Sequence, residues 1–194
     1  MFANNCGTSS DDMVTIAISG KSGCGNSTVS RIVAERLGLR LVNYTFHTIA
    51  DERGIPFDDL CRMAESDPGW DRYLDRRQVE MAHEGSCVLG SRLAVWLLKD
   101  EADLTVYLTA PLVVRAERIW KREGGSYGAV LDRTRLRDER DRYRYLRLYN
   151  IDNNEYEFVD LLVDTESVPP EGVADRIVAA AMPIVERKKK LDQI

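Results

Sequence analysis

Histidine and paired cysteines are scarce in this sequence, which disfavours two kinds of metal or redox site. Only two histidines are present, His47 and His83, so we do not expect a histidine-based metal centre. The four cysteines are scattered, and no two of them have the C-x-x-C spacing of a zinc or thioredoxin-like motif. We therefore expect free thiols in a reducing compartment.

Long apolar runs are also missing. No stretch approaches the roughly 18–20 apolar residues that cross a bilayer, so we expect no membrane partner. Residues 1–12 are polar and lack the basic-then-apolar order of a secretory signal. The sequence accordingly predicts a flexible leader over 1–12 and a cytoplasmic protein.

Positive charge is in short supply overall but concentrated in one segment. The net charge is −5, which disfavours nucleic acid as a partner because domains that bind a duplex are usually basic. Ten arginines nevertheless lie between Arg115 and Arg147. Such a cluster predicts an anionic ligand smaller than DNA.

The length and the spacing of apolar residues predict one α/β domain. A chain of 194 residues with 44% hydrophobic residues can bury a complete core. Short apolar segments alternate with segments of helical spacing, which indicates a parallel sheet covered on both faces. We expect strands over 13–19, 39–42, 87–89, 104–108 and 158–163, three short helices within 45–83, and further helices over 28–37, 93–98, 110–123, from 126 to 149 and over 170–190. The predicted fold is three-layered, with ligands at the carboxyl ends of five strands.

The most specific motif is a glycine-rich turn between the first strand and the first helix. Residues 20–27 read Gly-Lys-Ser-Gly-Cys-Gly-Asn-Ser, which matches the phosphate-loop pattern except that Asn26 replaces its lysine. Backbone N–H groups of such a loop converge on phosphate oxygens, and the Ser27 hydroxyl is the expected ligand of Mg²⁺. The alternative is a turn that only joins strand to helix. The predicted phosphate-binding residues are Gly20, Ser22, Gly23, Cys24, Gly25, Asn26, Ser27 and Thr28.

Several segments together carry a family resemblance. They are the phosphate loop, 37–39, 51–55, 64–68, 74–78, 91–96, 108–111, Arg118-Ile119, 122–124 and 149–152. In these segments the chain resembles the short, type-2-like cytidylate kinases, within the nucleoside monophosphate kinases. The resemblance implies a phosphate-loop NTPase fold and transfer of the ATP γ-phosphoryl group to CMP or dCMP, with Mg²⁺.

The resemblance also implies a domain plan. We expect one kinase-like domain over 13–187, with a helical monophosphate-binding insert over 44–84, a lid over 118–148 and a tail over 188–194. The expected partners are small-molecule nucleotides, and we expect a monomer. Two rival readings stay open: a nucleotide-binding regulator or scaffold without turnover, and a kinase for another small phosphate acceptor.

Positive charge is needed around a migrating phosphoryl group, because negative charge spreads over its oxygens. By resemblance, Arg118, Arg122 and Arg137 are the lid arginines that supply it. Lys21 is the only lysine of the loop and is the candidate to replace the cation lost at Asn26. The alternatives are a solvated arginine-rich helix face, which we expect for Arg133, Arg135 and Arg142, and a solvated lysine.

The acceptor pocket is predicted from three segments. The resemblance places Asp75, Arg77 and Gln78 at the monophosphate pocket, against the alternative of an exposed charged turn. Arg92 follows the third strand, where it can clamp a phosphate or form a salt bridge to the insert. His47 stands where the family has a phosphate-holding arginine, and Gly90 where it has an acidic residue.

Overall fold

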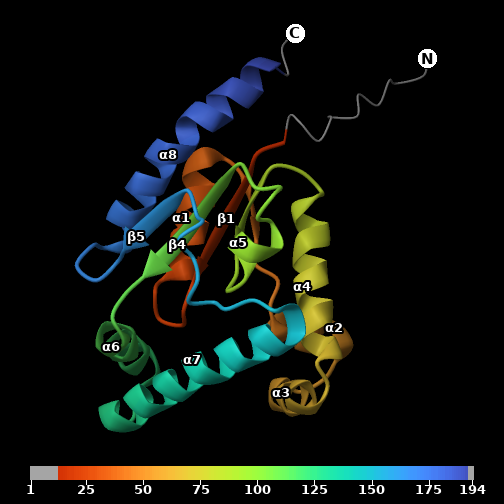
Figure 1. The fold of residues 1–194 in the computed structure, drawn as a ribbon, viewed down its shortest axis with the longest axis vertical. Helices are drawn as coiled ribbons and strands as arrows, with labels where there is room; N and C mark the ends of the chain where they lie inside the picture. The colour runs from red at the N-terminus through yellow and green to blue at the C-terminus, as the bar shows by residue number, and fades with distance from the viewer. Residues whose placement is uncertain (1–12, 192–194) are drawn as a thin grey trace.

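A five-stranded sheet, parallel throughout, forms the centre of the computed structural model, which describes residues 13–191 (Figure 1). The strands are ordered β2-β3-β1-β4-β5. This arrangement confirms the predicted α/β phosphate-loop fold. The predicted leader over 1–12 lies outside the described residues. The strands are β1 (Thr15–Gly20), β2 (Arg40–Val42), β3 (Cys87–Gly90), β4 (Leu104–Thr109) and β5 (Leu161–Asp164).

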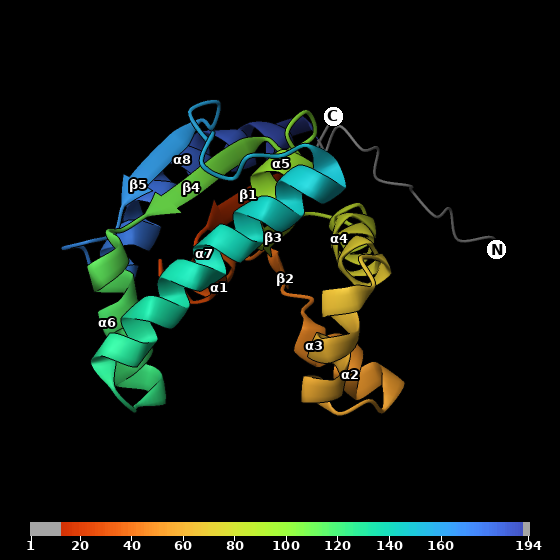
Figure 2. The ribbon, with the colours of Figure 1, turned by 60° about the horizontal axis from the view of Figure 1, so that its bottom comes forward.

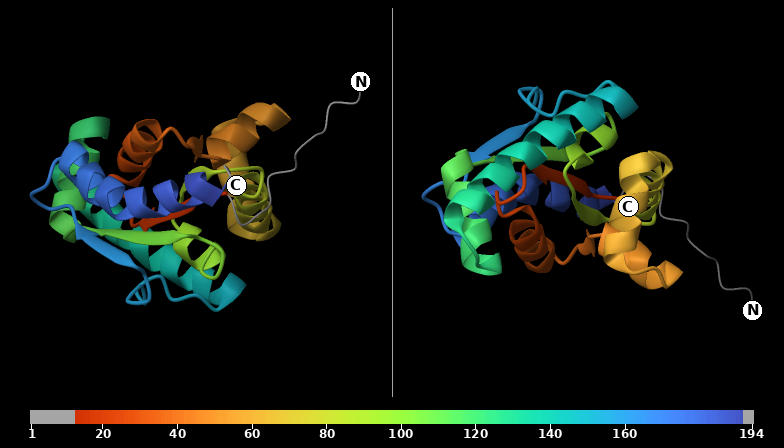
Figure 3. Two further views of the ribbon diagram at one scale, coloured as in Figure 1. Left: turned by 90° about the horizontal axis from the view of Figure 1, so that it is seen from above. Right: turned by 90° about the horizontal axis from the view of Figure 1, so that it is seen from below.

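Helices cover both faces of the sheet, which explains why its central strands are apolar on both sides. α1 (Asn26–Leu37) and α8 (Pro170–Leu191) pack on one face, where Val33 and Ile177 belong to the same buried cluster. The short helix α5 (Ala94–Leu97) and the chain before β5 cover the opposite face. The views from above and below show the sheet between these layers (Figure 3).

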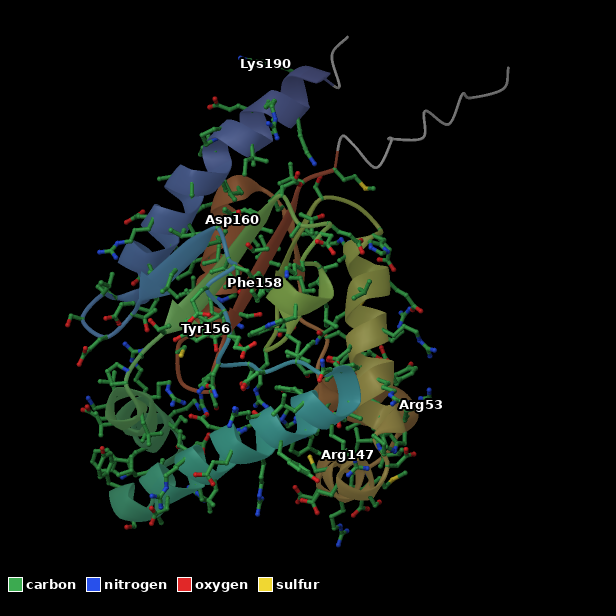
Figure 4. The ribbon with its side chains drawn as sticks, viewed as in Figure 1. Arg53, Arg147, Tyr156, Phe158, Asp160 and Lys190 are labelled. Carbon is green, nitrogen blue, oxygen red and sulfur yellow. The ribbon has the colours of Figure 1, made fainter. Side chains whose placement is uncertain are left out.

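Residues 158–160, which we expected to begin the last strand, form an irregular segment before β5. The strand predicted over 158–163 begins at Leu161, because the preceding residues are held by side chains instead of a ladder. The Asp160 carboxylate accepts hydrogen bonds from Thr105 N at 2.8 Å and from its hydroxyl at 2.6 Å. Tyr156 stacks on Tyr107, with ring centroids 4.1 Å apart, and Phe158 meets Trp96 edge-on. Figure 4 labels Tyr156, Phe158 and Asp160 along this segment.

The insert after β2 forms three helices with a small core of its own. They are α2 (Phe46–Arg53), α3 (Phe57–Ser66) and α4 (Gly69–Ala82). Gly54 ends α2 with a φ of 63°, a left-handed conformation that favours glycine. Ile49 and Leu60 are fully buried between these helices. The three short helices predicted within 45–83 are therefore present.

α6 (Leu112–Glu123) and the start of α7 (Tyr127–Tyr149) lie on the opposite side of the molecule from the insert (Figure 2). Gly124 and Gly125 join them with φ angles of 75° and 85°. α7 then crosses below the carboxyl edge of the sheet until its end reaches the insert, where Tyr149 Oη donates to the Asp75 carboxylate at 2.6 Å (Figure 1).

The carboxyl end of the described chain is helical. α8 runs from Pro170 to Leu191, close to the helix predicted over 170–190, and residues 192–194 lie outside the described part. Lys188 fixes the last turns through an ion pair with the Asp103 carboxylate at 2.6 Å. Between residues 13 and 191, no helix has the length and apolarity to span a membrane.

Candidate functional site

The glycine-rich turn adopts the conformation that a phosphate loop requires. Gly23 and Gly25 have φ angles of 87° and 90°, and a Cβ atom on Gly23 would lie 2.7 Å from the Arg115 carbonyl oxygen. No side chain caps the start of α1 within the described chain. Its first N–H groups are therefore available to an anion, and the helix dipole favours negative charge there.

Asn26, at the position of the missing lysine, is fully engaged by the protein. Its amide nitrogen donates to the carbonyl oxygens of Ile18 at 3.2 Å and Ser91 at 3.0 Å. Its amide oxygen accepts from the Ser30 hydroxyl at 2.9 Å. Because both amide N–H groups are used, the side chain braces the loop against β1 and the end of β3 and has no donor left for a phosphate.

The glycine at position 90 belongs to the same arrangement. A Cβ atom on Gly90 would lie 2.5 Å from the Ser30 hydroxyl oxygen and 3.3 Å from the Asn26 amide oxygen. The Asn26–Ser30 hydrogen bond thus fills the space that an acidic side chain at position 90 would occupy. Gly90 at the end of β3 and Asn26 at the start of α1 both depart from the family pattern, and the two departures depend on each other because the side chains of Asn26 and Ser30 need the space beside Gly90.

Lys21 extends from the loop toward the chain that follows α7. Its ammonium group donates to Asn154 Oδ1 at 2.6 Å. The same chain segment is held by Arg142, which binds the Asp152 carboxylate with its closest contact at 2.6 Å. This interaction of Arg142 lowers the pKa of Asp152 to about 2. Lys21 also lines the open cleft beside the loop, while its ammonium group makes this contact with Asn154.

Two arginines of α6 hold the phosphate loop by donating to its backbone carbonyl oxygens. Arg115 is 4% exposed; it donates to the Ser22 carbonyl oxygen at 3.0 Å and binds the Asp138 carboxylate at 2.6 and 3.2 Å. Arg118, a predicted lid arginine, donates to the Gly23 carbonyl oxygen at 3.3 Å and to the Thr165 hydroxyl at 3.0 Å. Arg115 therefore links the loop to α7, and Arg118 links it to the end of β5.

Four further arginines line the cleft and make fewer contacts with the protein than Arg115 and Arg118 do: Arg122, Arg133, Arg137 and Arg140. Arg122 is exposed and pairs with the adjacent Glu123 at 2.6 Å. Arg133, Arg137 and Arg140 line the cleft from one face of α7 and make no ion pair or hydrogen bond within residues 13–191. Although Arg137 is exposed by area, desolvation by the cleft and then the Arg92 cation lower its pKa. Arg133, expected on a solvated face, thus joins Arg137 at the cleft.

A chain of alternating charges connects β3, α7 and α4. Arg92 binds Asp141 at 2.7 Å, and Arg144 binds the other oxygen of Asp141 at 3.0 Å. Arg144 Nε also lies 3.5 Å from Asp71 Oδ1. A salt bridge to the insert was the alternative to a phosphate contact for Arg92; the salt bridge that the structure shows is to α7 instead. Burial raises the pKa of Asp71, and Arg144 opposes the shift.

The cleft side of α4 carries three polar residues at helical spacing, Asp71, Asp75 and Gln78. Gln78 is 4% exposed and donates to the Tyr44 carbonyl oxygen at 2.8 Å. Burial raises the pKa of Asp75 to about 6, although the hydrogen bond from Tyr149 acts in the opposite direction. Arg77 lies outside the cleft lining, paired with Glu80 at 2.6 Å.

His47 lies on the insert wall of the same cleft. Its ring stacks on Phe57, with centroids 3.7 Å apart and planes 8° from parallel. The residue is exposed, as expected for a histidine at the start of α2. This wall of the cleft therefore carries a stacked imidazole where the resemblance leads us to expect the permanent cation of an arginine.

All of these elements surround one open cleft of about 1500 Å³. Within the described residues, five buried side-chain polar atoms have no hydrogen-bond partner. Four of them belong to residues that line this cleft: Asp71 Oδ2, Gln78 Oε1, Ser91 Oγ and Arg144 Nε. Because buried polar groups are nearly always paired in proteins, this concentration indicates a ligand site.

The donors for a metal ion are few. No group of three His, Cys, Asp or Glu side chains gathers anywhere in residues 13–191. The Ser27 hydroxyl is exposed, lines the cleft and lies on the first turn of α1. Mg²⁺ commonly takes one protein oxygen together with phosphate oxygens and waters, so this donor set fits a cation that arrives with a nucleotide.

Sequence reasoning missed Arg115, Asp138, Asp71 and Asp141 as parts of the site. The signal for Asp138 and Asp141 was present, since both lie within the arginine-rich segment. Asp71 offered no signal, because an acidic residue in the first turn of a helix is ordinarily solvated and favourable there.

The chain is similar to known proteins over most of its length. Residues 15–167 match the model of the cytidylate kinase-like family. Cytidylate kinase 2 of Borreliella burgdorferi is 48% identical over 166 residues, which cover 84% of this chain and 92% of that protein. Cytidylate kinase of Pyrococcus horikoshii is 42% identical over 171 residues, covering 87% of this chain and 88% of the relative.

Solved structures share the fold. Shikimate kinase from Acinetobacter baumannii, solved in complex with shikimate, is 17% identical and superposes with a TM-score of 0.58, covering 88% of this chain and 94% of that one. Shikimate kinase from Bacteroides thetaiotaomicron is 15% identical with a TM-score of 0.60, over 90% and 99% of the two chains. At these identities the likeness concerns the fold alone.

Proposed function

Because the chain belongs to the cytidylate kinase-like family, we propose that it transfers the γ-phosphoryl group of ATP to CMP or dCMP. The observation that carries the proposal is the position of the loop, which faces unpaired arginines of α7 and the polar face of α4 across one cleft. A donor phosphate at the loop and an acceptor phosphate near α4 would meet in this cleft.

The phosphate loop, residues 20–28, binds the ATP phosphates through backbone N–H groups. The Ser27 hydroxyl is the protein ligand of Mg²⁺, which when bound neutralises charge on the donor phosphates. Arg118 and Arg122 flank the donor side of the loop. On the acceptor side we assign Arg92, Asp75, Gln78 and His47, and we leave Arg77 as a prediction from the resemblance. These roles follow from the cleft lining and the family together.

Neutralisation of the migrating phosphoryl group is assigned to Arg137 and Lys21. Asn26 has no free donor, so the cation must come from elsewhere. Arg137 faces the cleft without an anionic partner in the described chain, and Lys21 need only exchange its contact with Asn154. Because the acceptor is already a phosphate oxygen, positioning and charge complementarity supply the catalysis and no strong base is needed.

A coupled assay of ADP formation tests the proposal. Purified protein is incubated with MgATP and each of CMP, dCMP, UMP, AMP and GMP. We expect turnover with CMP or dCMP and much lower rates with the purine monophosphates. Turnover with none of the five, in a preparation that binds ATP by calorimetry, would show the proposed activity to be wrong.

One observation favours a second candidate, a nucleotide-binding protein without turnover. The position whose lysine usually donates to the β- and γ-phosphates is here Asn26. Its amide N–H groups are already hydrogen-bonded to the carbonyl oxygens of Ile18 and Ser91. A protein of this kind would bind ATP and a monophosphate and would form no ADP above the background of ATP alone. The same assay, with calorimetry, therefore separates the two candidates.

A further inference from the structure

The cation of the phosphate loop is held by a group that carries no charge. Lys21 is the only lysine or arginine in residues 20–28, and its Nζ donates to Asn154 Oδ1 at 2.6 Å, across 133 positions of the chain. The backbone of Lys21 is fixed, because its carbonyl oxygen accepts from Cys24 N at 3.1 Å. The side chain, a flexible stem with three rotatable donors, is therefore the part of Lys21 that can move.

The segment that presents Asn154 is anchored to its surroundings. Asn154 N donates to Asp152 Oδ1 at 3.0 Å, and Arg142 of α7 binds the same carboxylate. The neighbouring Asn153 is 6% exposed, and its carbonyl oxygen accepts from the Tyr107 hydroxyl of β4 at 3.3 Å. The exposed amide of Asn154 thus stands on a backbone that is tied to α7 and to the sheet, which keeps it beside the phosphate loop.

A carboxylate close to Lys21 is already occupied. Arg142 Nε lies 2.9 and 3.0 Å from the two oxygens of Asp152, and Arg142 Nη2 lies 2.6 Å from one of them. The hydrogen bond from Arg142 is the main cause that lowers the pKa of Asp152 to about 2, and the charge of Lys21 lowers it further. Arg142 therefore neutralises the anion nearest to Lys21, and the ammonium group bonds a neutral amide instead.

A neutral acceptor allows an ammonium group to be exchanged. Hydrogen bonds between two ionised groups are about twice as strong as those between neutral ones, so phosphate oxygens compete well with an amide for Lys21 and less well with a carboxylate. Building on the proposed function, we infer that Asn154 is a positioning residue, which holds the Lys21 ammonium beside the phosphate loop before ATP binds and releases it to the donor phosphates afterwards. The neutrality of residue 154 makes this exchange possible.

The first test observes Lys21 directly. In protein with isotope-labelled lysine, the side-chain resonance of Lys21 is assigned by its absence from Lys21→Arg. We expect this resonance to shift when the Mg²⁺ complex of a non-hydrolysable ATP analogue is added, and to shift less in N154D. Lys121, paired with Glu117 at 2.6 Å on α6, is the control whose resonance should stay in place. An unmoved Lys21 resonance, in a preparation that binds the analogue by calorimetry, would overturn the inference.

The second test gives residue 154 a charge while keeping its shape. N154D places a carboxylate opposite the ammonium group, which should retain Lys21 at that position. We expect kcat with CMP to fall at least about tenfold and the Kd of ATP to change less than about threefold. N154A removes the contact without adding a charge and should lower kcat less than N154D does. Equal kcat values of N154D and the wild type would contradict the role of Asn154.

A double variant separates an effect through Lys21 from repulsion of the phosphates by the new carboxylate. If residue 154 acts through Lys21, adding N154D to Lys21→Ala should change kcat by less than about threefold, because the group on which it acts is already missing. A loss of about tenfold or more in both backgrounds would show that the carboxylate acts on the phosphates directly, and the inference would then be wrong.

Resonance and turnover distinguish the failure of this inference from that of the proposed function. If CMP is phosphorylated and the Lys21 resonance does not respond to the ATP analogue, only the role of Asn154 is wrong. If the resonance shifts with the analogue, shifts less in N154D, and no ADP forms with any monophosphate, the exchange of Lys21 stands and the kinase activity is wrong.

Discussion

The side-chain amide nitrogen of Asn26 donates a hydrogen bond to the backbone carbonyl oxygen of Ser91 at 3.0 Å. With the companion bond to Ile18, it fixes the first residue of α1 to β1 and to the chain after β3. A neutral amide therefore braces the phosphate loop from the position where the motif has its cation. The loop keeps its shape and its backbone donors, and in the proposed activity the positive charge comes from Lys21 and from Arg137 of α7.

Removing this brace should destabilise the protein. Asn26→Ala leaves the Ser91 carbonyl oxygen and the Ser30 hydroxyl without the bonds that the Asn26 side chain supplies. It also removes one of two donors to the Ile18 carbonyl oxygen, which keeps the bond from Ser91 N at 3.2 Å. We expect the free energy of unfolding, measured by urea denaturation, to fall by about 1–3 kcal/mol. Asn154→Ala, which removes an exposed amide, is the control and should change it by less than about 0.5 kcal/mol. Equal effects of the two variants would contradict the bracing role.

The Arg115–Asp138 pair should couple the loop to α7. Arg115→Gln leaves a nearly buried carboxylate without its cation, and we expect a loss of about 3 kcal/mol in unfolding free energy. A double-mutant cycle with Asp138→Asn measures the coupling, for which we expect about 1–3 kcal/mol. The exposed Arg135–Asp132 pair, 3.1 Å apart, is the control cycle and should give less than about 0.5 kcal/mol. A coupling no larger than that of the control would show that the pair does not hold α7.

The elements of the fold could be predicted because each has a local signal. The apolar strands and the glycine and proline breaks of the insert define helices and strands close to those observed. The order of the strands could not be predicted in the same way. It depends on how each crossover packs on the sheet, and β3 lies between β2 and β1 although the whole insert separates it from β2 in the chain.

The site was predictable where residue spacing defines it and unpredictable where distant contacts do. The spacing of the loop glycines predicts the positive φ angles observed at Gly23 and Gly25. Gln78 lines the cleft, which is where the resemblance places it. Arg115 resembles any arginine on an amphipathic helix until it meets the Ser22 carbonyl oxygen, 93 positions away in the chain. Arg77 has a carboxylate three residues along its own helix, and that local pair holds it outside the cleft.

Lys21 should contribute to turnover more than to binding. If its ammonium group leaves Asn154 for the phosphates in the reacting complex, Lys21→Ala should lower kcat about a hundredfold and change the Kd of ATP less than about threefold. Steady-state kinetics and calorimetry measure the two effects. Lys121→Ala removes an exposed lysine paired with Glu117 and should leave both unchanged. An unaltered kcat in Lys21→Ala would leave the α7 arginines as the cation.

Asp75 should make stability fall as the pH rises. Burial raises its pKa to about 6 in the folded protein, above the value of about 3.9 for an unperturbed carboxyl, so the folded state binds the extra proton. Its contribution is therefore complete below about pH 4 and is lost by about pH 6 and above. Asp75→Asn removes this dependence. The wild type loses this contribution between pH 4.5 and 7.5, and the variant does not. The unfolding free energy of the variant minus that of the wild type should therefore rise by about 1–2 kcal/mol from pH 4.5 to pH 7.5.

Urea denaturation at the two pH values measures this gain. Asp51→Asn, at an exposed position of α2, makes the same substitution without burial and should show no pH-dependent difference from the wild type. A parallel pH dependence of Asp75→Asn and the wild type would contradict the shifted titration of Asp75.

The most direct test of a transfer site whose cation comes from α7 is the single-turnover rate of phosphoryl transfer from ATP to CMP in Arg137→Gln. Arg137 faces the cleft from α7, whereas Arg135 on the same helix is exposed and pairs with Asp132, so Arg135→Gln is the matched control. We predict that Arg137→Gln lowers the rate about a hundredfold or more, while Arg135→Gln leaves it unchanged. A rate for Arg137→Gln within about threefold of the wild type would contradict the assignment.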